Sequence, residues 1–287
     1  MRIQADFIGI YPYQQTPEVY QELCDILYPD GNVPPRAFLD IPVEEPRLLL
    51  LIACLQRHGW TPWSGLGHQK PTEYTLYLRR YYDTQDYENA AFLRPNPECH
   101  YKEAYRQENG AFRVEELPKK AHEIGGSGGG AIMVFDRIKR LMEEELRHVL
   151  FAPVELAAKA SRKIAGPVWE LTSGLILPSL APPNYLVTDA DQPFTGSYES
   201  YESGCLLREE LSAPESLFLP PQSLYMTSEL YFRRADIEAL EPFDLAKTKG
   251  KFGLSSDGPC LVASAKFYRF CLKHQLPMRW RPVWLTE

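Results

Sequence analysis

The sequence predicts an α+β fold with two related halves, each ending in a strand-helix-strand unit and packed on mixed β-sheets. Three observations lead to this prediction. An apolar run at 48–55 has helical character, a segment at 74–82 is rich in strand-forming residues, and a strand-helix-strand pattern occurs at both 131–156 and 260–285. The chain of 287 residues, 44% hydrophobic and 24% charged, has the composition of a globular protein with a sizeable core.

The first predicted elements lie in the N-terminal part. The run at 48–55 is far shorter than the roughly 20 residues that a helix needs to cross a bilayer, so we expect a buried helix there. Gly59 is suited to the left-handed conformation that ends a helix, after which the chain turns into an aromatic strand at 60–63. The segment at 74–82, YTLYLRRYY, is the next predicted strand.

The repeated pattern is the most specific feature of the sequence. Residues 260–285 align with 131–156 without a gap, at an offset of 129. Ile138 and Leu141 match Phe267 and Phe270 at a spacing that places each pair on one face of a helix. The pattern indicates an internal duplication, with chance resemblance of two such units as the alternative.

The repeat also makes two local predictions. The motif Phe-x-Pro-Val-x-Leu at 151–156 matches Trp-x-Pro-Val-x-Leu at 280–285, and its proline predicts an edge strand or a bulge. Upstream, Phe112-Arg113 is matched with Phe232-Arg233. We place the boundary between the predicted halves, 1–156 and 157–287, at 157–167, where Ala165-Gly166-Pro167 breaks a short helical pattern.

Charge and cysteine content restrict the environment and the ligands. Residues 1–156 contain 17 basic and 23 acidic residues and the remainder 14 and 15, so six of the seven excess negative charges lie in the first part. Such a surface repels phosphate backbones, which disfavours nucleic acid, and attracts basic proteins. The six cysteines form no CxxC pair and no export signal precedes them, so we expect reduced thiols, a cytoplasmic location and no membrane insertion.

Candidate catalytic and cofactor motifs are weak. The glycine-rich run at 125–130 is followed by Ala131-Ile132-Met133 where a phosphate loop needs Lys-Ser or Lys-Thr, so we interpret the run as a flexible linker. Glu115-Glu116 and the carboxylates at 143–145 suit solvated surfaces rather than acid-base catalysis. No nucleophile motif surrounds any serine or cysteine, so the sequence predicts neither an enzyme nor a cofactor.

Cysteine and histidine, which bind metals, occur close together in one part of the sequence. Cys54 and His58 are one helical turn apart and His68 follows ten residues later. Because this set lacks a fourth ligand, we expect no metal to be held by it.

Two segments combine tyrosines with carboxylates and contain no basic residue. Tyrosines offer large contact areas at low entropic cost, and carboxylates pair with Lys or Arg of a basic partner. The segments therefore predict a partner-binding surface, with a tyrosine-bearing strand edge and a solvated turn as the alternative. The candidate residues are Tyr81, Tyr82, Asp83, Asp86, Tyr87, Glu88, Asp189, Asp191, Tyr198, Glu199, Tyr201 and Glu202.

The C-terminal part resembles a known protein family. The segments Pro167-Val168-Trp169-Glu170, Leu177-Pro178-Ser179, Phe243 to Thr248, Leu261 to Ser264 and Arg281-Pro282-Val283 carry the resemblance. Together they resemble the bacterial double-CxxCG family of predicted immunity proteins of polymorphic toxin systems, although the CxxCG motifs are absent here. The resemblance implies a cytoplasmic, non-enzymatic protein that binds and neutralises a cognate toxin. An enzyme of unfamiliar type and an adaptor protein are the alternatives, and nothing indicates the oligomeric state.

Overall fold

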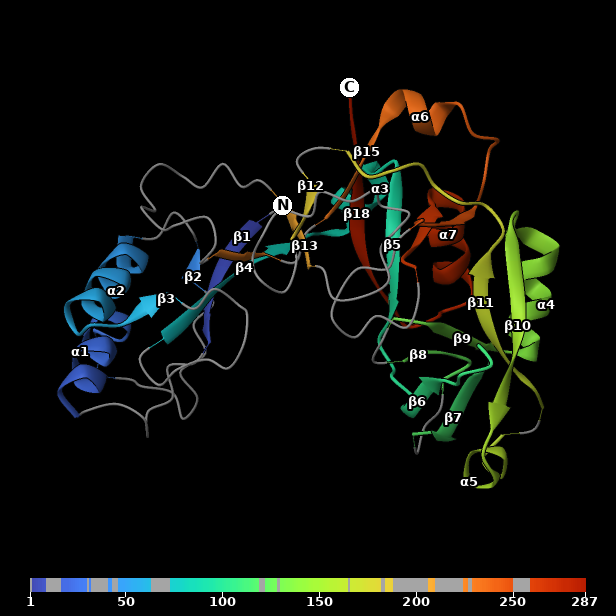
Figure 1. The fold of residues 1–287 in the computed structure, drawn as a ribbon, viewed down its shortest axis with the longest axis horizontal. Coiled ribbons are helices and arrows are strands. Elements are labelled where there is room, and N and C mark those ends of the chain that lie inside the picture. Colours follow the sequence, from blue (N-terminus) through green and yellow to red (C-terminus); the bar gives the residue numbers. More distant parts are fainter. Residues whose placement is uncertain are drawn as a thin grey trace. The chain divides into compact units, whose positions relative to one another are not determined.

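The computed structural model describes residues 2–8, 17–29, 31, 41–42, 46–62, 73–118, 122–127, 130–164, 166–181, 184–187, 206–209, 224–226, 229–249 and 259–287. Their fold is α+β, as predicted (Figure 1). The chain forms two compact units. Unit 1 comprises Met1–Asp83, Asp189–Gln192 and Arg208–Ser228, and unit 2 comprises the remainder. The boundaries of these units differ from those of the predicted halves, 1–156 and 157–287, which stay a prediction.

Unit 1 contains a mixed sheet and two helices. Its sheet has the order β14-β4-β1-β2, and β3 also pairs with β4. The strands are β1 (Arg2–Ile8), β2 (Ile41–Pro42), β3 (Thr61–Pro62), β4 (Glu73–Tyr81) and β14 (Leu224–Met226), and the helices are α1 (Pro17–Leu27) and α2 (Pro46–Arg57).

The two helices of unit 1 arise from clear apolar stripes. In α1 the buried residues include Val19, Leu23 and Leu27, and in α2 Leu48, Leu51 and Leu55 are at most 1% exposed. This periodicity makes the two helices pack against each other through their apolar faces. The predicted helix is therefore confirmed, and Gly59 ends its last turn with a φ of 76°, as expected.

Unit 2 contains two larger sheets. The first has the order β6-β7-β10-β11-β9-β8 and the second β15-β18-β5-β17-β16, while β12 and β13 form a separate pair. The strands are β5 (Phe92–Pro97), β6 (Lys102–Arg106), β7 (Phe112–Glu116), β8 (Ile124–Gly126), β9 (Ile132–Phe135), β10 (Val149–Leu156), β11 (Val168–Ser173), β12 (Asn184–Val187), β15 (Leu230–Arg233), β16 (Leu245–Lys247), β17 (Leu261–Ser264) and β18 (Met278–Thr286), while β13 (Leu206–Glu209) begins in unit 2 and ends in unit 1. The helices are α3 (Thr84–Asn89), α4 (Asp136–Glu145), α5 (Ala158–Ser161), α6 (Arg234–Glu238) and α7 (Ala265–Lys273).

The two segments of the repeated sequence follow the same path. The first forms β9, α4 and β10, and the second forms β17, α7 and β18, with the strands beginning at positions 129 residues apart. Ile138 and Phe267, which the alignment matched, are both fully buried. The apolar spacing read from the sequence therefore positions both helices.

Apart from β6, which has no counterpart in the second sheet, the two sheets share strand order, strand direction and register. β10 runs antiparallel to β11 and parallel to β7, and β18 runs antiparallel to β5 and parallel to β15. The registers also correspond, because Val154 lies opposite Phe112 and Val168 in the first sheet, and Val283 lies opposite Leu230 and Phe92 in the second. The upstream match from sequence was therefore two residues out of register, since Phe112 corresponds to Leu230 rather than to Phe232.

Each sheet contains an inner strand whose chain then continues to the edge of the other sheet. β5 lies between β18 and β17, and the residues after it, Cys99 and Tyr101, bond to Gly126 at the edge of the first sheet. β11 lies between β10 and β9, and Leu175 and Leu177 bond in the same way to Lys247 at the edge of the second sheet. The two sheets are thus joined by two equivalent crossings.

The two prolines of the repeated motif, Pro153 and Pro282, affect strand pairing only at their own positions. Pro153 lies opposite Trp169 within the β10–β11 ladder, and pairing with β7 begins at the next residue, Val154. Pro282 precedes the start of the β15 pairing at Val283 in the same way. A proline has no N–H to donate, so it is tolerated where only one side of the strand is paired.

The interpretation of residues 125–130 as a flexible linker was wrong for the part that is described. Gly125 and Gly126 are buried in β8, and Ser127 is 1% exposed. The Ser127 amide donates to the carbonyl of Ala131, and the Ser127 Oγ accepts from the Ala131 amide, which forms a turn between β8 and β9. Glycine is required in this strand because Tyr101 occupies the space where a side chain at 125 would lie.

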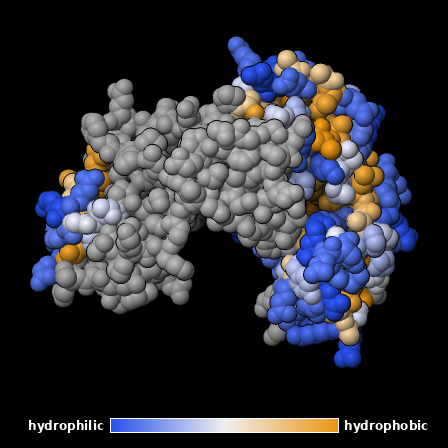
Figure 2. Space-filling model, in the orientation of Figure 1, coloured by the Kyte–Doolittle hydropathy of each residue, from blue (hydrophilic) through white to orange (hydrophobic). Residues whose placement is uncertain are grey.

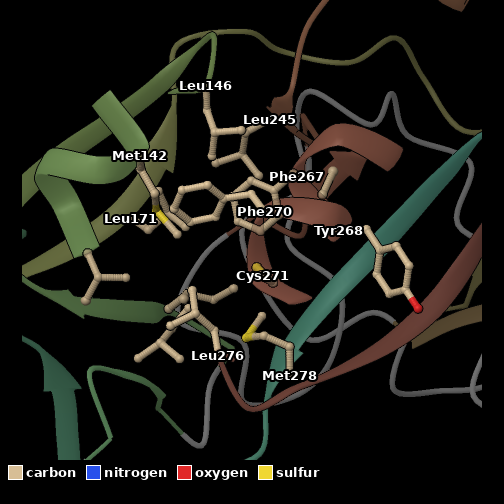
Figure 3. Close-up of a cluster of buried hydrophobic side chains, with 14 of the residues drawn as sticks. Met142, Leu146, Leu171, Leu245, Phe267, Tyr268, Phe270, Cys271, Leu276 and Met278 are labelled. Carbon is tan, nitrogen blue, oxygen red and sulfur yellow. The ribbon is translucent and has the colours of Figure 1, made fainter. Parts of the chain in front are cut away.

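The helices α4 and α7 contribute to one hydrophobic core. Figure 3 shows Met142 and Leu146 from the first repeated segment in the same cluster as Phe267, Phe270 and Cys271 from α7. The ring of Trp280 contacts Phe267 and Tyr268 edge-on, with centroids 6.2 and 5.2 Å away. The aromatic residues of α7 therefore form a large part of this core cluster.

Candidate functional site

The first predicted partner-binding segment lies at the end of β4 and in α3. Tyr81 is the last residue of β4, and Asp86, Tyr87 and Glu88 lie in α3. Asp83 and Glu88 are exposed, whereas Tyr81, Tyr82, Asp86 and Tyr87 are partly buried. The structure thus brings two carboxylates of this segment to the surface and holds its tyrosines closer to the protein.

Tyr87 packs α3 against the core of unit 2. Its ring centroid lies 6.3 Å from that of Tyr268, and it packs against the core cluster that contains Trp280. Burial, followed by the nearby Tyr268, raises the pKa of Tyr87 above its ordinary value. The pKa of Tyr268 is also raised, first by burial and then by the charge of Glu88. The acidic residues of α3 are therefore attached to a fixed element rather than to a loop.

The second predicted segment cannot be added to this surface. Its candidate residues lie outside the described part of the chain; they are Asp189, Asp191, Tyr198, Glu199, Tyr201 and Glu202. Their role in binding stays a prediction of the sequence.

A different set of reactive side chains comes together in unit 1. The ligand atoms of Glu22, Cys54 and His58 all lie within 4.8 Å of one another. His58 and Arg57 both bond to the Glu22 carboxylate, and the bond to His58 is the main cause that lowers the pKa of Glu22. Burial raises the pKa of the Cys54 thiol. Two of these residues were candidates from sequence, whereas His68 lies outside the described residues and Glu22, on another helix, was missed.

A cavity of about 390 Å³ lies between strands of the two sheets in unit 2. Its lining includes Arg106, Glu170, Thr172 and Lys247, and none of its lining residues is a histidine, cysteine or serine. The guanidinium of Arg106 donates to both carboxylate oxygens of Glu170, at 2.5 and 3.2 Å, and also lies over the ring of Phe112. This ion pair holds two of the charged groups that line the cavity.

The carboxylate pairs considered from sequence are engaged by cations. Glu115 accepts from Arg113, and this bond lowers the pKa of Glu115. Glu116 accepts from Lys159 at 2.9 Å. Glu145 accepts from Lys273 at 2.8 Å, and this bond is the first cause that lowers the pKa of Glu145. These arrangements fit surface ion pairs, which agrees with the interpretation from sequence.

Comparisons with known proteins add no relative. No family model matches the chain, no curated protein matches it, and no solved structure matches it.

Two further features concern the surface and the thiols. Within the described residues, no helix has the length and hydropathy to span a membrane. The cysteines in the described part of the chain are free thiols: Cys24, Cys54, Cys99, Cys260 and Cys271. Figure 2 shows hydrophobic residues at the surface, and among the described residues the large exposed hydrophobic side chains are those of Leu49, Leu50, Tyr105, Leu150, Ile176 and Leu272. They are distributed over both units.

Proposed function

We propose that this chain is a non-enzymatic binding protein whose partner is a protein with a basic surface. The observation that carries the proposal is α3, in which Glu88 is exposed while Tyr87 packs against the core of unit 2, and the exposed Asp83 immediately precedes this helix in the chain. A fixed element loses little conformational entropy on binding, and exposed carboxylates accelerate the encounter with a basic partner.

We further propose that the partner is a cognate bacterial toxin and that binding neutralises it. This step rests on the resemblance of the C-terminal segments to predicted immunity proteins. A basic toxin, such as one that acts on nucleic acid, is complementary in charge to a chain with a net charge of −7.

The proposal is tested by finding the partner and its activity. The chain, carrying an affinity tag, is expressed in its native cell, and proteins retained with it are identified by mass spectrometry. We expect a basic protein that arrests growth when expressed alone in a second host, and growth that recovers when the chain is co-expressed. A retained protein without toxicity would favour the adaptor alternative. Turnover of a small molecule that depends on Glu170 in the cavity would favour an enzyme.

The binding surface has a separate test in the purified complex. Glu88→Gln combined with Asp83→Asn should reduce the association rate about two- to fivefold at low salt, with little effect at high salt. The matched control is Glu144→Gln, which removes one exposed carboxylate from α4. Equal rates for the wild type and the double variant would place the interface elsewhere.

A further inference from the structure

Three side chains with different metal-binding atoms converge between the helices of unit 1. Cys54 lies in the last turn of α2, His58 directly follows that helix, and Glu22 extends from α1. Their Sγ, imidazole nitrogen and carboxylate oxygen atoms lie within 4.8 Å of one another, and His58 Nε2 is 2.9 Å from Glu22 Oε2. The three side chains can meet only because α1 and α2 are aligned so that Glu22 lies beside Cys54 and His58.

The packing of the helices determines that register. Leu51 and Leu55 flank Cys54 on the buried face of α2, and Leu23, which is next to Glu22, is buried on α1. The side chain of Arg47 donates to the carbonyl of Leu27 at the other end of the helix pair. The side chain of Cys54 is therefore directed toward α1, where Glu22 approaches it.

We propose that Glu22, Cys54 and His58 bind a zinc ion. A thiolate, an imidazole and a carboxylate form a donor set that suits Zn²⁺, whereas Mg²⁺ and Ca²⁺ prefer oxygen atoms only. The thiol releases its proton to solvent as the sulfur binds the metal. This site differs from any that the absent CxxCG motifs would form, and it does not depend on the proposed function.

The geometry requires small movements. In a tetrahedral zinc site the ligand atoms are about 3.4–3.6 Å apart, given the usual metal–ligand distances. The present separations, up to 4.8 Å, reach these values through side-chain rotations. Cys54 supplies the buried side of the site, while the side chains of Glu22 and His58 are 34% and 32% exposed. The ion can therefore enter from solvent, and water or a group of a partner completes its coordination.

Arg57 supports the carboxylate from outside the metal site. Its Nη2 lies 2.5 Å from Oε1 of Glu22, so Oε2 is the oxygen that faces His58. A hydrogen bond to the second oxygen of a ligating carboxylate orients it toward the metal. The sequence-based expectation of no metal applied to a set with His68, whereas the structure assigns Glu22 as the third ligand.

Zinc binding to the full chain provides the test. Purified protein is freed of metal with a chelator, incubated with zinc, desalted and measured for metal content and melting temperature. We expect one zinc ion per chain and a higher melting temperature with zinc. His58→Gln and Glu22→Gln, which change partly exposed side chains, should each weaken binding about 100-fold or more. Asp25→Asn, which removes an exposed carboxylate from α1, is the matched control and should bind as the wild type does.

Cobalt identifies the sulfur ligand. Co²⁺ bound to a thiolate gives a charge-transfer absorption in the near ultraviolet, which should appear in the wild type and be lost in Cys54→Ser. Absence of stoichiometric zinc, or zinc bound equally by the wild type and by the folded His58→Gln and Glu22→Gln variants, would overturn the proposal. Zinc bound without the cobalt–thiolate absorption would also overturn it.

Discussion

The five equivalent strands of the two large sheets of unit 2 have the same order and register, but different side chains pack on them. Tyr101 follows β5 and packs against Gly125 of β8. The equivalent residues of the second sheet are Leu177, which follows β11, and Ala246 of β16. Tyr101 and Leu177 are each 2% exposed. A large side chain opposite glycine in one sheet thus corresponds to a smaller side chain opposite alanine in the other.

This comparison shows that backbone geometry and side-chain volume are separately specified. Strand pairing depends on register and on the proline positions, which both sheets share. Packing density depends on the summed volume of facing side chains, which each sheet reaches with a different pair. The helices follow the same rule, because Ile138 and Met142 of α4 correspond to Phe267 and Cys271 of α7.

The largest expected effect concerns the aromatic residues of α7. Phe267→Ala should lower the free energy of unfolding by about 4 kcal/mol, because it removes a fully buried ring that contacts Phe270 and Trp280. Ile138→Val at the equivalent position of α4 should cost only about 1 kcal/mol. Urea unfolding measures both. A cost of only about 1 kcal/mol for Phe267→Ala would contradict the full burial of its ring.

The next effect tests the exchange of volume between the sheets. A Cβ at residue 125 would overlap the ring of Tyr101, so Gly125→Ala should cost about 3 kcal/mol. Combining Gly125→Ala with Tyr101→Leu reproduces the pair of the second sheet, and the double variant should be more stable than the sum of the single changes predicts. Additive costs in urea unfolding would contradict the interpretation that these two positions compensate each other.

The N-terminus of α7 has a side-chain cap, whereas the N-terminus of α4 has none. Ser264 Oγ accepts from the amides of Lys266 and Phe267 at the start of α7, whereas Phe135 provides no such bond to α4. Ser264→Ala should therefore lower the free energy of unfolding by about 1 kcal/mol, as measured in urea. Ser264→Asn, which keeps a capping oxygen, should retain most of that stability. A cost of zero for the alanine variant would mean that the cap is replaced by another partner.

The smallest effect concerns the contact between equivalent helix ends. Glu145 and His274 occupy positions 129 residues apart, and the Glu145 carboxylate accepts from both Lys273 and His274. Because these bonds lower the pKa of Glu145 below 4.5 in the folded protein, they contribute stability above that pH, which is lost as the pH falls through the lowered pKa.

This contact predicts a pH-dependent difference between two variants. Below pH 4.5 the stability advantage of the wild type over Glu145→Gln should shrink. Urea unfolding at low and neutral pH measures this advantage, and Glu144→Gln is the control. An advantage that is independent of pH would show that the charge of Glu145 is not involved.

The sequence by itself determined the local elements. The apolar spacing at 131–156 and 260–285 predicted two strand-helix-strand paths, and Gly59 predicted the end of α2, because helix stripes and left-handed glycines depend on neighbouring residues in the chain. The tyrosines and carboxylates at 81–88 were visible for the same reason, although their division into anchored and exposed residues was not.

Only the tertiary structure decided which distant segments meet. Nothing in the local pattern shows that β5 lies between β17 and β18 or that β11 lies between β9 and β10, since strand pairing over such separations depends on the packing of the whole unit. The glycines at 125–126 were interpreted as a linker because their need for space arises from Tyr101, more than twenty residues earlier. Glu22 was missed for the same physical reason: its partners Cys54 and His58 reach it only when two separate helices pack side by side.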